Sequence, residues 1–109
     1  MLEESAKRGR SEIVTSKAIS EGKRLMKNNQ FEKGLAVFAE CTARHPQSLE
    51  ARYLMGVCAF HLEHYPEAIE HFNVLLGHDP RYKKNAYLFL AISLKKQHQY
   101  EEALIVVRR

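Results

Sequence analysis

The chain lacks most of the features by which enzymes, membrane proteins and secreted proteins are recognised. Two cysteines in 109 residues are too few for a disulfide framework or a four-ligand zinc site. Cys41 and Cys58 each sit where a small apolar residue would pack on a helix, so we expect buried thiols. The five glycines are scattered singly, which excludes a glycine-rich phosphate loop. The longest charge-free stretches, such as Asn85–Leu94, fall well short of the roughly 20 residues that a membrane helix needs.

The amino terminus lacks a targeting signal. Residues 1–10 have no apolar core of the kind found in signal peptides, and their bases lie among glutamates, unlike those of a transit peptide. We therefore expect a cytoplasmic protein, with a nuclear or organelle-surface assembly as the alternative. Residues 1–14 are predicted to form a polar lead-in, and residues 1–10 have no helical stripe.

No arrangement of side chains indicates catalysis, a metal or a cofactor. Nucleophile–base pairs and paired carboxylates in a suitable context are missing. Of the six histidines, His61 and His64 are three apart, but His64 falls at an expected turn, and the others are scattered. We predict a protein that is not an enzyme and that binds no metal or cofactor.

What the chain does have is a repeat of about 34 residues. Gly22 and Gly56 are 34 apart, and small, aromatic and proline residues recur in one order. The same spacing relates Phe31 to Tyr65, Gly34 to Ala68, Phe38 to Phe72 and Pro46 to Pro80. A third copy follows at 35, relating Gly56 to Ala91, Tyr65 to Tyr100 and Ala68 to Ala103. A period of this length predicts stacked helical hairpins.

Each period contains two helix patterns separated by turn residues. Apolar residues recur three and four apart, Ser48 is a good N-cap, and Pro66 suits a first helical turn. A mid-helix glycine costs about 1 kcal/mol, so Gly56 is expected to allow close helix packing. No strand alternation is visible, and the fold class is all-α with about six helices. The expected helices cover 11–28, 31–44, 49–62, 66–76, 82–96 and 100 onward, in repeats 15–48, 49–83 and 84–109.

This pattern resembles the tetratricopeptide repeat. The second period carries Met55-Gly56, Tyr65-Pro66-Glu67-Ala68-Ile69, Phe72 and Asp79-Pro80. The third carries Leu90-Ala91 and Tyr100-Glu101-Glu102-Ala103-Leu104. The chain departs from the family pattern at Arg52, at Glu21 and at Gly34. The resemblance implies a right-handed α-solenoid, and the short last helix leads us to expect a piece of a longer array.

The resemblance also implies a concave groove, lined by the first helix of each pair, that binds a partner protein. Helical phase gives an apolar strip edged by lysines, which suits a helix or extended peptide with apolar anchors and some acidic residues. Tyr53 and Phe60 are expected to stay accessible, whereas Ile19, Val57 and Ile92 can pack against neighbouring helices. The predicted groove set is Ile19, Lys23, Met26, Lys27, Tyr53, Val57, Phe60, His61, Leu88, Ile92, Lys95 and Lys96.

One familiar subtype of this groove does not fit. Family members that grip acidic chaperone tails use a clamp of Lys, Arg and Asn at fixed places on the first helices. The corresponding places here hold Ile19 and Lys23, then Leu54, then Asn85 and Phe89. The chain is therefore not expected to be a chaperone-tail adaptor.

Two other functions stay open. The first is self-association or a scaffold role, through an open carboxyl-terminal end that exposes Leu94, Leu104 and Val107. The second, which ranks lower, is nucleic-acid binding, because the net charge is +4 but the bases are interleaved with acids. No membrane partner is expected.

Overall fold

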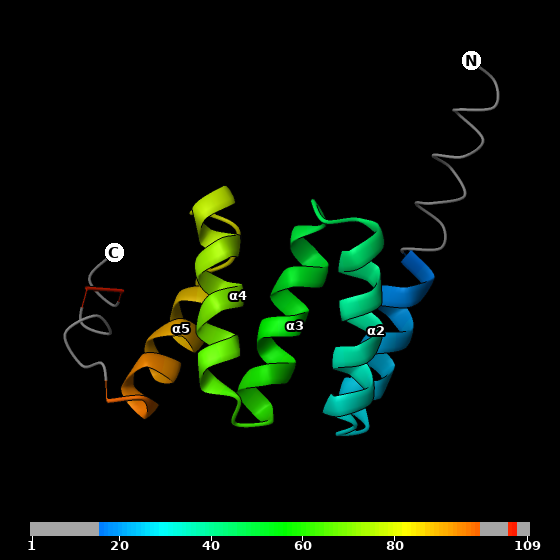
Figure 1. Ribbon diagram of the computed structural model, residues 1–109, viewed down its shortest axis with the longest axis horizontal. Helices are drawn as coiled ribbons and strands as arrows, with labels where there is room; N and C mark the ends of the chain where they lie inside the picture. The colour runs from blue at the N-terminus through cyan, green and yellow to red at the C-terminus, as the bar shows by residue number, and fades with distance from the viewer. Residues whose placement is uncertain (1–15, 99–104, 107–109) are drawn as a thin grey trace, which may run out of the picture.

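The computed structural model describes residues 16–98 and 105–106, and it shows antiparallel helices that follow one another in chain order (Figure 1). Helix α3 contacts both α2 and α4, and it also touches α5. No strand occurs among the described residues, so the all-α prediction is confirmed. The helices are an unlabelled first helix at 16–27, then α2 Phe31–Arg44, α3 Leu49–His61, α4 Tyr65–His78 and α5 Lys84–Lys96.

The observed boundaries follow the expected ones closely. Ser48 caps α3, where its Oγ accepts a hydrogen bond from the Ala51 N–H at 3.3 Å. Helix α4 continues through Gly77, whose missing side chain faces open space. Helix α5 begins two residues later than expected, because Tyr82 belongs to a turn in which its N–H bonds to the Asp79 carbonyl.

The turn inside each helix pair repeats in the backbone as well as in the sequence. Glu63 has a positive φ of 63°, and the His64 N–H bonds back to the Ala59 carbonyl at 2.8 Å. This is a Schellman-type helix end with a non-glycine residue in the left-handed region. Asn29 and His98, which lie 34 before and 35 after Glu63, have φ values of 61° each. The backbone conformation at these turns therefore repeats with the same period as the sequence.

Glycine–phenylalanine contacts let the helices of the first two pairs approach closely. A Cβ at Gly56 would lie 2.8 Å from the Phe72 ring, and one at Gly22 would collide with the Phe38 ring. Both rings are fully buried. The expectation that Gly56 allows close packing is confirmed, since the ring occupies the space of the missing side chain.

The cysteines are part of the core. Cys41 and Cys58 are free and buried, and burial raises the pKa of the Cys58 thiol to about 11. Burial, with the nearby Glu50 carboxylate, also raises the pKa of Cys41. The prediction of buried thiols is confirmed.

The carboxyl-terminal side differs in part from expectation. Leu94 is only 3% exposed and belongs to the same buried cluster as Val106, so the prediction of an open face at Leu94 is wrong. Leu94 is buried because its side of α5 faces the core. Leu104, Val107 and the lead-in at 1–14 lie outside the described residues, and the repeat boundaries stay predictions.

Candidate protein-binding surface

The predicted groove set does not form one accessible surface. Ile19, Tyr53 and Val57 are buried, with exposures of 9%, 8% and 7%. Burial of Ile19 and Val57 matches the expectation that they pack against neighbouring helices. The expectation that Tyr53 stays accessible is wrong.

Tyr53 is covered by the chain segment that leads into α5 and by α5 itself. Its ring lies 5.9 Å from the Tyr82 ring, 6.5 Å from Phe89 and 6.2 Å from Phe72. The ammonium of Lys83 sits 4.7 Å from the centre of the Tyr53 ring, within cation–π range. This burial raises the pKa of Tyr53, so its hydroxyl stays neutral at physiological pH.

The rest of the predicted groove set is at least partly accessible. Phe60 is half-buried and packs edge-on against Phe89 at 4.9 Å, while His61 is exposed and stacks on Phe31 at 4.4 Å. Lys23 is exposed and forms an ion pair of 2.7 Å with Glu50. The half-buried members are Met26, Phe60 and Ile92, and the exposed ones are Lys23, Lys27, His61, Leu88, Lys95 and Lys96.

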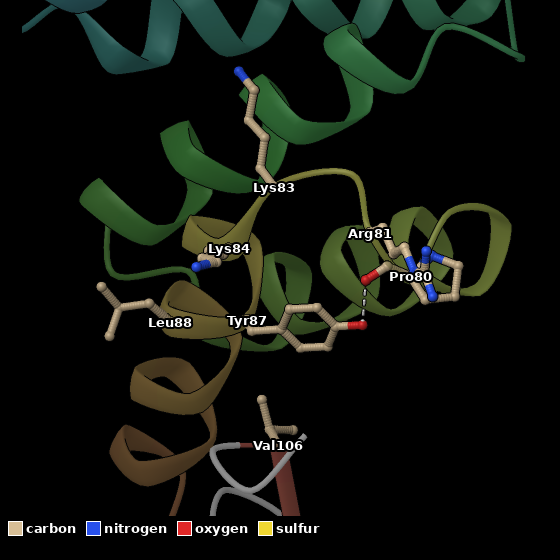
Figure 2. A pocket seen from close by; sticks show the side chains of 7 residues that line it. All are labelled: Pro80, Arg81, Lys83, Lys84, Tyr87, Leu88 and Val106. Atoms are coloured by element: carbon tan, nitrogen blue, oxygen red, sulfur yellow. Dashed lines mark hydrogen bonds between the residues drawn. The ribbon is translucent and has the colours of Figure 1, made fainter.

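A cavity of about 560 Å³ lies at the start of α5 (Figure 2). We call it the basic cavity. Only Leu88 belongs to both the basic cavity and the predicted groove set. Its lining residues are Pro80, Arg81, Lys83, Lys84, Tyr87, Leu88 and Val106.

The apolar part of the basic cavity is built on Tyr87. The Tyr87 hydroxyl donates a hydrogen bond of 2.6 Å to the Pro80 carbonyl, which fixes the ring between Pro80 and Val106 (Figure 2). Leu88 extends into solvent and is 55% exposed. The ring and the two aliphatic side chains give the cavity an apolar surface beside water.

The charged part of the basic cavity has one sign. Arg81, Lys83 and Lys84 are exposed, and no carboxylate lines the cavity among the described residues. Asp79 is near in sequence, but its carboxylate accepts a hydrogen bond of 3.1 Å from the backbone N–H of Arg81. Among residues 16–98 and 105–106, none of the three cationic side chains forms an ion pair.

Three other basic residues on the surface behave differently. Lys23 pairs with Glu50 at 2.7 Å, and Arg44 pairs with Glu40 at 2.9 Å. Arg24 likewise pairs with its helix neighbour three residues before it. Acids and bases are interleaved along the sequence. At the basic cavity, however, three bases lie with no acid among the described lining residues.

Sequence reasoning missed Arg81, Lys83, Lys84 and Tyr87. The run Arg81–Lys84 was visible, but the neighbouring acid at position 79 made it look balanced. A usable signal was present at the start of α5, whose first turn contains no acidic residue.

Comparison with known proteins agrees with this architecture. Residues 19–86, more than half of the chain, match the model of a family described as "Tetratricopeptide repeat". The chain belongs to the tetratricopeptide repeat family, as the sequence pattern predicted. No curated protein matches it closely enough to be counted as a relative.

Two solved structures of MamA mutants have the same fold. The first is 19% identical with a TM-score of 0.79, and the alignment covers 98% of this chain and 64% of that one. The second is 20% identical with a TM-score of 0.79, and the alignment covers 95% of this chain and 82% of that one. This chain therefore spans less than two thirds of the first MamA chain, and the likeness concerns the fold alone.

Family and fold together give a coarse function. Tetratricopeptide repeat proteins are generally adaptors without catalytic activity, so membership of the family suggests a role in protein–protein interaction or scaffolding. None of the described helices is long and apolar enough to cross a membrane. Within that same part of the chain, no three metal-binding side chains lie close enough to hold an ion.

Proposed function

We propose that the chain is an adaptor module that binds a helix or extended peptide of a partner protein within a larger assembly. The binding surface is the accessible remainder of the predicted groove set, with Leu88 as its apolar anchor. Phe60 and His61 on α3 and the lysines of α5 extend this surface. Cytoplasmic, nuclear and organelle-surface assemblies are all compatible with this role.

The observation that carries the proposal is the exposure of Leu88. Tyr53 lies 35 residues earlier, at the same phase of its helix, and is 8% exposed, whereas Leu88 is 55% exposed. A large apolar side chain left open where its counterpart is covered suits a protein contact, since apolar side chains form the centres of such interfaces. Covering the rest of Leu88 would contribute a fraction of the roughly 1.5–3 kcal/mol of a fully buried leucine.

The test places a charge on this surface and on a matched control surface. Leu88→Glu should abolish capture of the partner from the source cells, because a carboxylate at the anchor must lose its water on binding. Val74→Glu is the control, since Val74 is 38% exposed on α4 and lies outside the predicted groove set. Quantitative mass spectrometry of captured proteins, with circular dichroism to confirm folding, gives the readout. Equal capture by wild type and both variants would rule this surface out.

Self-association and nucleic-acid binding are separated by two further measurements. Sedimentation across a concentration series that showed a dimer, lost in Leu88→Glu, would assign the surface to a second copy. Tight, salt-sensitive binding of RNA or DNA in a filter assay would favour the nucleic-acid alternative.

A further inference from the structure

The start of α5 carries the opposite charge from the starts of its neighbours. Helices α2, α3 and α4 have Glu32, Glu50 and Glu67 in their first turns. Acidic side chains belong there because the first N–H groups of a helix carry partial positive charge. Helix α5 has no acid in its first turn, its N-cap residue Lys83 makes no side-chain cap, and Lys84 is its first residue.

Three cationic residues therefore lie at or just before a helix end that is itself positive, although the Lys83 side chain points away from Tyr87, Leu88 and Val106 (Figure 2). Arg81, Lys83 and Lys84 all line the basic cavity, and none has a carboxylate partner among the described residues. Lys83 is held in place by the rings of Tyr53 and Tyr82, at 4.7 and 5.6 Å from their centres. A ligand with carboxylates would relieve this concentration of like charge, and a cationic ligand would add to it.

The apolar part of the cavity restricts the ligand further. Tyr87 is fixed by its hydrogen bond to Pro80, and Leu88 and Val106 also line the cavity. A volume of about 560 Å³ lies within the roughly 300–1,000 Å³ of typical ligand sites. A ligand that fills it must present an apolar side chain together with negative charge.

We propose that the basic cavity binds an acidic peptide segment of a partner protein. One apolar side chain of the segment packs on Tyr87 and Leu88, and flanking Asp or Glu carboxylates pair with Arg81 and Lys84. The site differs from the chaperone-tail clamp, because its cations come from the connection before α5 and from its first turn. The inference rests on the proposed function, since Leu88 takes part in both.

A peptide fits this surface better than a nucleic acid does. Nucleic acids need a continuous row of unpaired cations along their phosphates. Elsewhere on the described surface, Lys23, Arg24 and Arg44 are already paired with glutamates. Lys27, Lys33 and Lys95 also lack an ion pair among the described residues, but none of them lines the cavity. In the cavity, cations and an apolar ring meet in one small space, which suits a short acidic motif.

The direct test is fluorescence anisotropy with labelled synthetic peptides. The probe has a central Leu-Phe pair with three glutamates on each side. One comparison peptide replaces every glutamate by glutamine, and another replaces Leu-Phe by Gly-Ser. The probe should bind the wild-type chain at least tenfold more tightly than either comparison peptide, and more weakly as salt increases.

Variants of the chain locate the binding. Arg81→Gln with Lys84→Gln should weaken binding of the probe at least tenfold, because it removes the two cations that pair with the carboxylates of the peptide. The matched control is Lys17→Gln with Lys33→Gln, which removes the same charge from exposed residues outside the cavity and should change binding less than twofold. Equal binding of the glutamine peptide, or an undiminished affinity in the cavity variant, would refute the assignment.

Capture of the cellular partner by two of these variants separates the failure of this inference from that of the proposed function. If Leu88→Glu loses the cellular partner while Arg81→Gln with Lys84→Gln keeps it, the adaptor role stands and the acidic ligand is wrong. If both variants keep the partner, both proposals fall. Tighter binding of a single-stranded oligonucleotide than of the probe, or a dimer abolished by the cavity variant, would also overturn the acidic peptide.

Discussion

Tyr53 and Leu88 occupy equivalent places in successive helix pairs, yet one is in the core and the other is in solvent. Tyr53 is covered because Tyr82, Lys83 and Phe89 pack against its ring. Leu88 has no such cover among the described residues and is 55% exposed. In a stacked-helix protein, the burial of a side chain therefore depends on its next neighbour in the stack as much as on its own helix.

The same two helices differ in how they begin. Helix α3 starts with the Ser48 cap and Glu50, the arrangement that satisfies the free N–H groups and their partial charge. Helix α5 starts with Lys83 and Lys84 and has no side-chain cap. The stabilising start of α3 thus precedes the buried Tyr53. The less stable start of α5 precedes the exposed Leu88 and borders the basic cavity.

The largest expected effect tests the covered against the open position. Tyr53→Ala should lower the free energy of unfolding by about 3 kcal/mol, because it leaves a cavity among buried rings. Leu88→Ala should lower it by less than about 0.5 kcal/mol, as is usual for an exposed site. Urea unfolding followed by circular dichroism measures both. Similar losses for the two variants would contradict the difference in burial.

The next effect compares two helical glycines and should have opposite signs. Gly56→Ala should destabilise by about 1–2 kcal/mol, because the new methyl group meets the buried Phe72 ring. Gly77→Ala should stabilise by up to about 1 kcal/mol, because its side chain enters open space and alanine favours a helix. Thermal melts of both variants decide the matter. A gain in stability for Gly56→Ala would mean that the ring moves aside at no cost.

The turn between α3 and α4 should also respond to substitution. Glu63→Gly should stabilise by about 0.5–1 kcal/mol, because Glu63 has a φ of 63°, which glycine adopts without strain. Asn29→Gly, at the equivalent turn, should gain less because asparagine tolerates this conformation better. Denaturant midpoints compare the two. A loss of stability in Glu63→Gly would show that the side chain contributes more than the strain costs.

The charge at the start of α5 should have a smaller effect. Lys84→Glu should stabilise by about 0.3–1 kcal/mol at low salt, because an acid replaces a cation at a helix N-terminus. Lys95→Glu, near the other end of α5, should destabilise slightly for the opposite reason. Melts at two salt concentrations give the comparison, since screening reduces both effects. Lys84→Glu should at the same time weaken binding of the acidic probe, so stability and binding change in opposite directions.

The smallest expected effect is a pH dependence of stability caused by His71, which lies near Arg52. The equivalent positions 35 residues later hold Tyr87 and Val106, and tyrosine and valine side chains do not titrate near neutral pH. Burial, together with the Arg52 guanidinium, lowers the pKa of His71 below its ordinary 6.5. The unfolded chain therefore binds this proton more tightly than the folded chain, and stability falls as the pH drops below about 6.5. Above that pH the group is neutral in both states and has no effect.

His71→Gln tests this pH dependence because it removes the titrating ring. The slope of stability between pH 5 and 6.5 should be smaller in this variant than in the wild type. His78→Gln is the control, since His78 is exposed at the end of α4. An unchanged slope in His71→Gln would show that other groups account for the acid sensitivity.

Sequence and structure contributed differently to the site. Of the predicted groove set, His61 and the four lysines are exposed, as helical phase predicted. The prediction that Tyr53 is accessible was wrong because a helix pattern shows only which face of the helix a residue is on. What covers that face depends on the packing of the next helix pair. The basic cavity was not predicted from the sequence, because charges that alternate along a chain need not alternate in space.

The sequence by itself determined the helices, their turns and the order of the stack. It does so because apolar spacing, glycine–phenylalanine pairs and helix-end residues act within one period of about 34 residues, and each is local enough to be seen in the chain. Only the tertiary structure decided that Tyr53 is buried, that Leu88 is exposed and that three cationic residues line one cavity with no carboxylate among its described lining residues. Those outcomes depend on contacts between successive helix pairs, where burial and charge are set by distances in space that no spacing along the chain specifies.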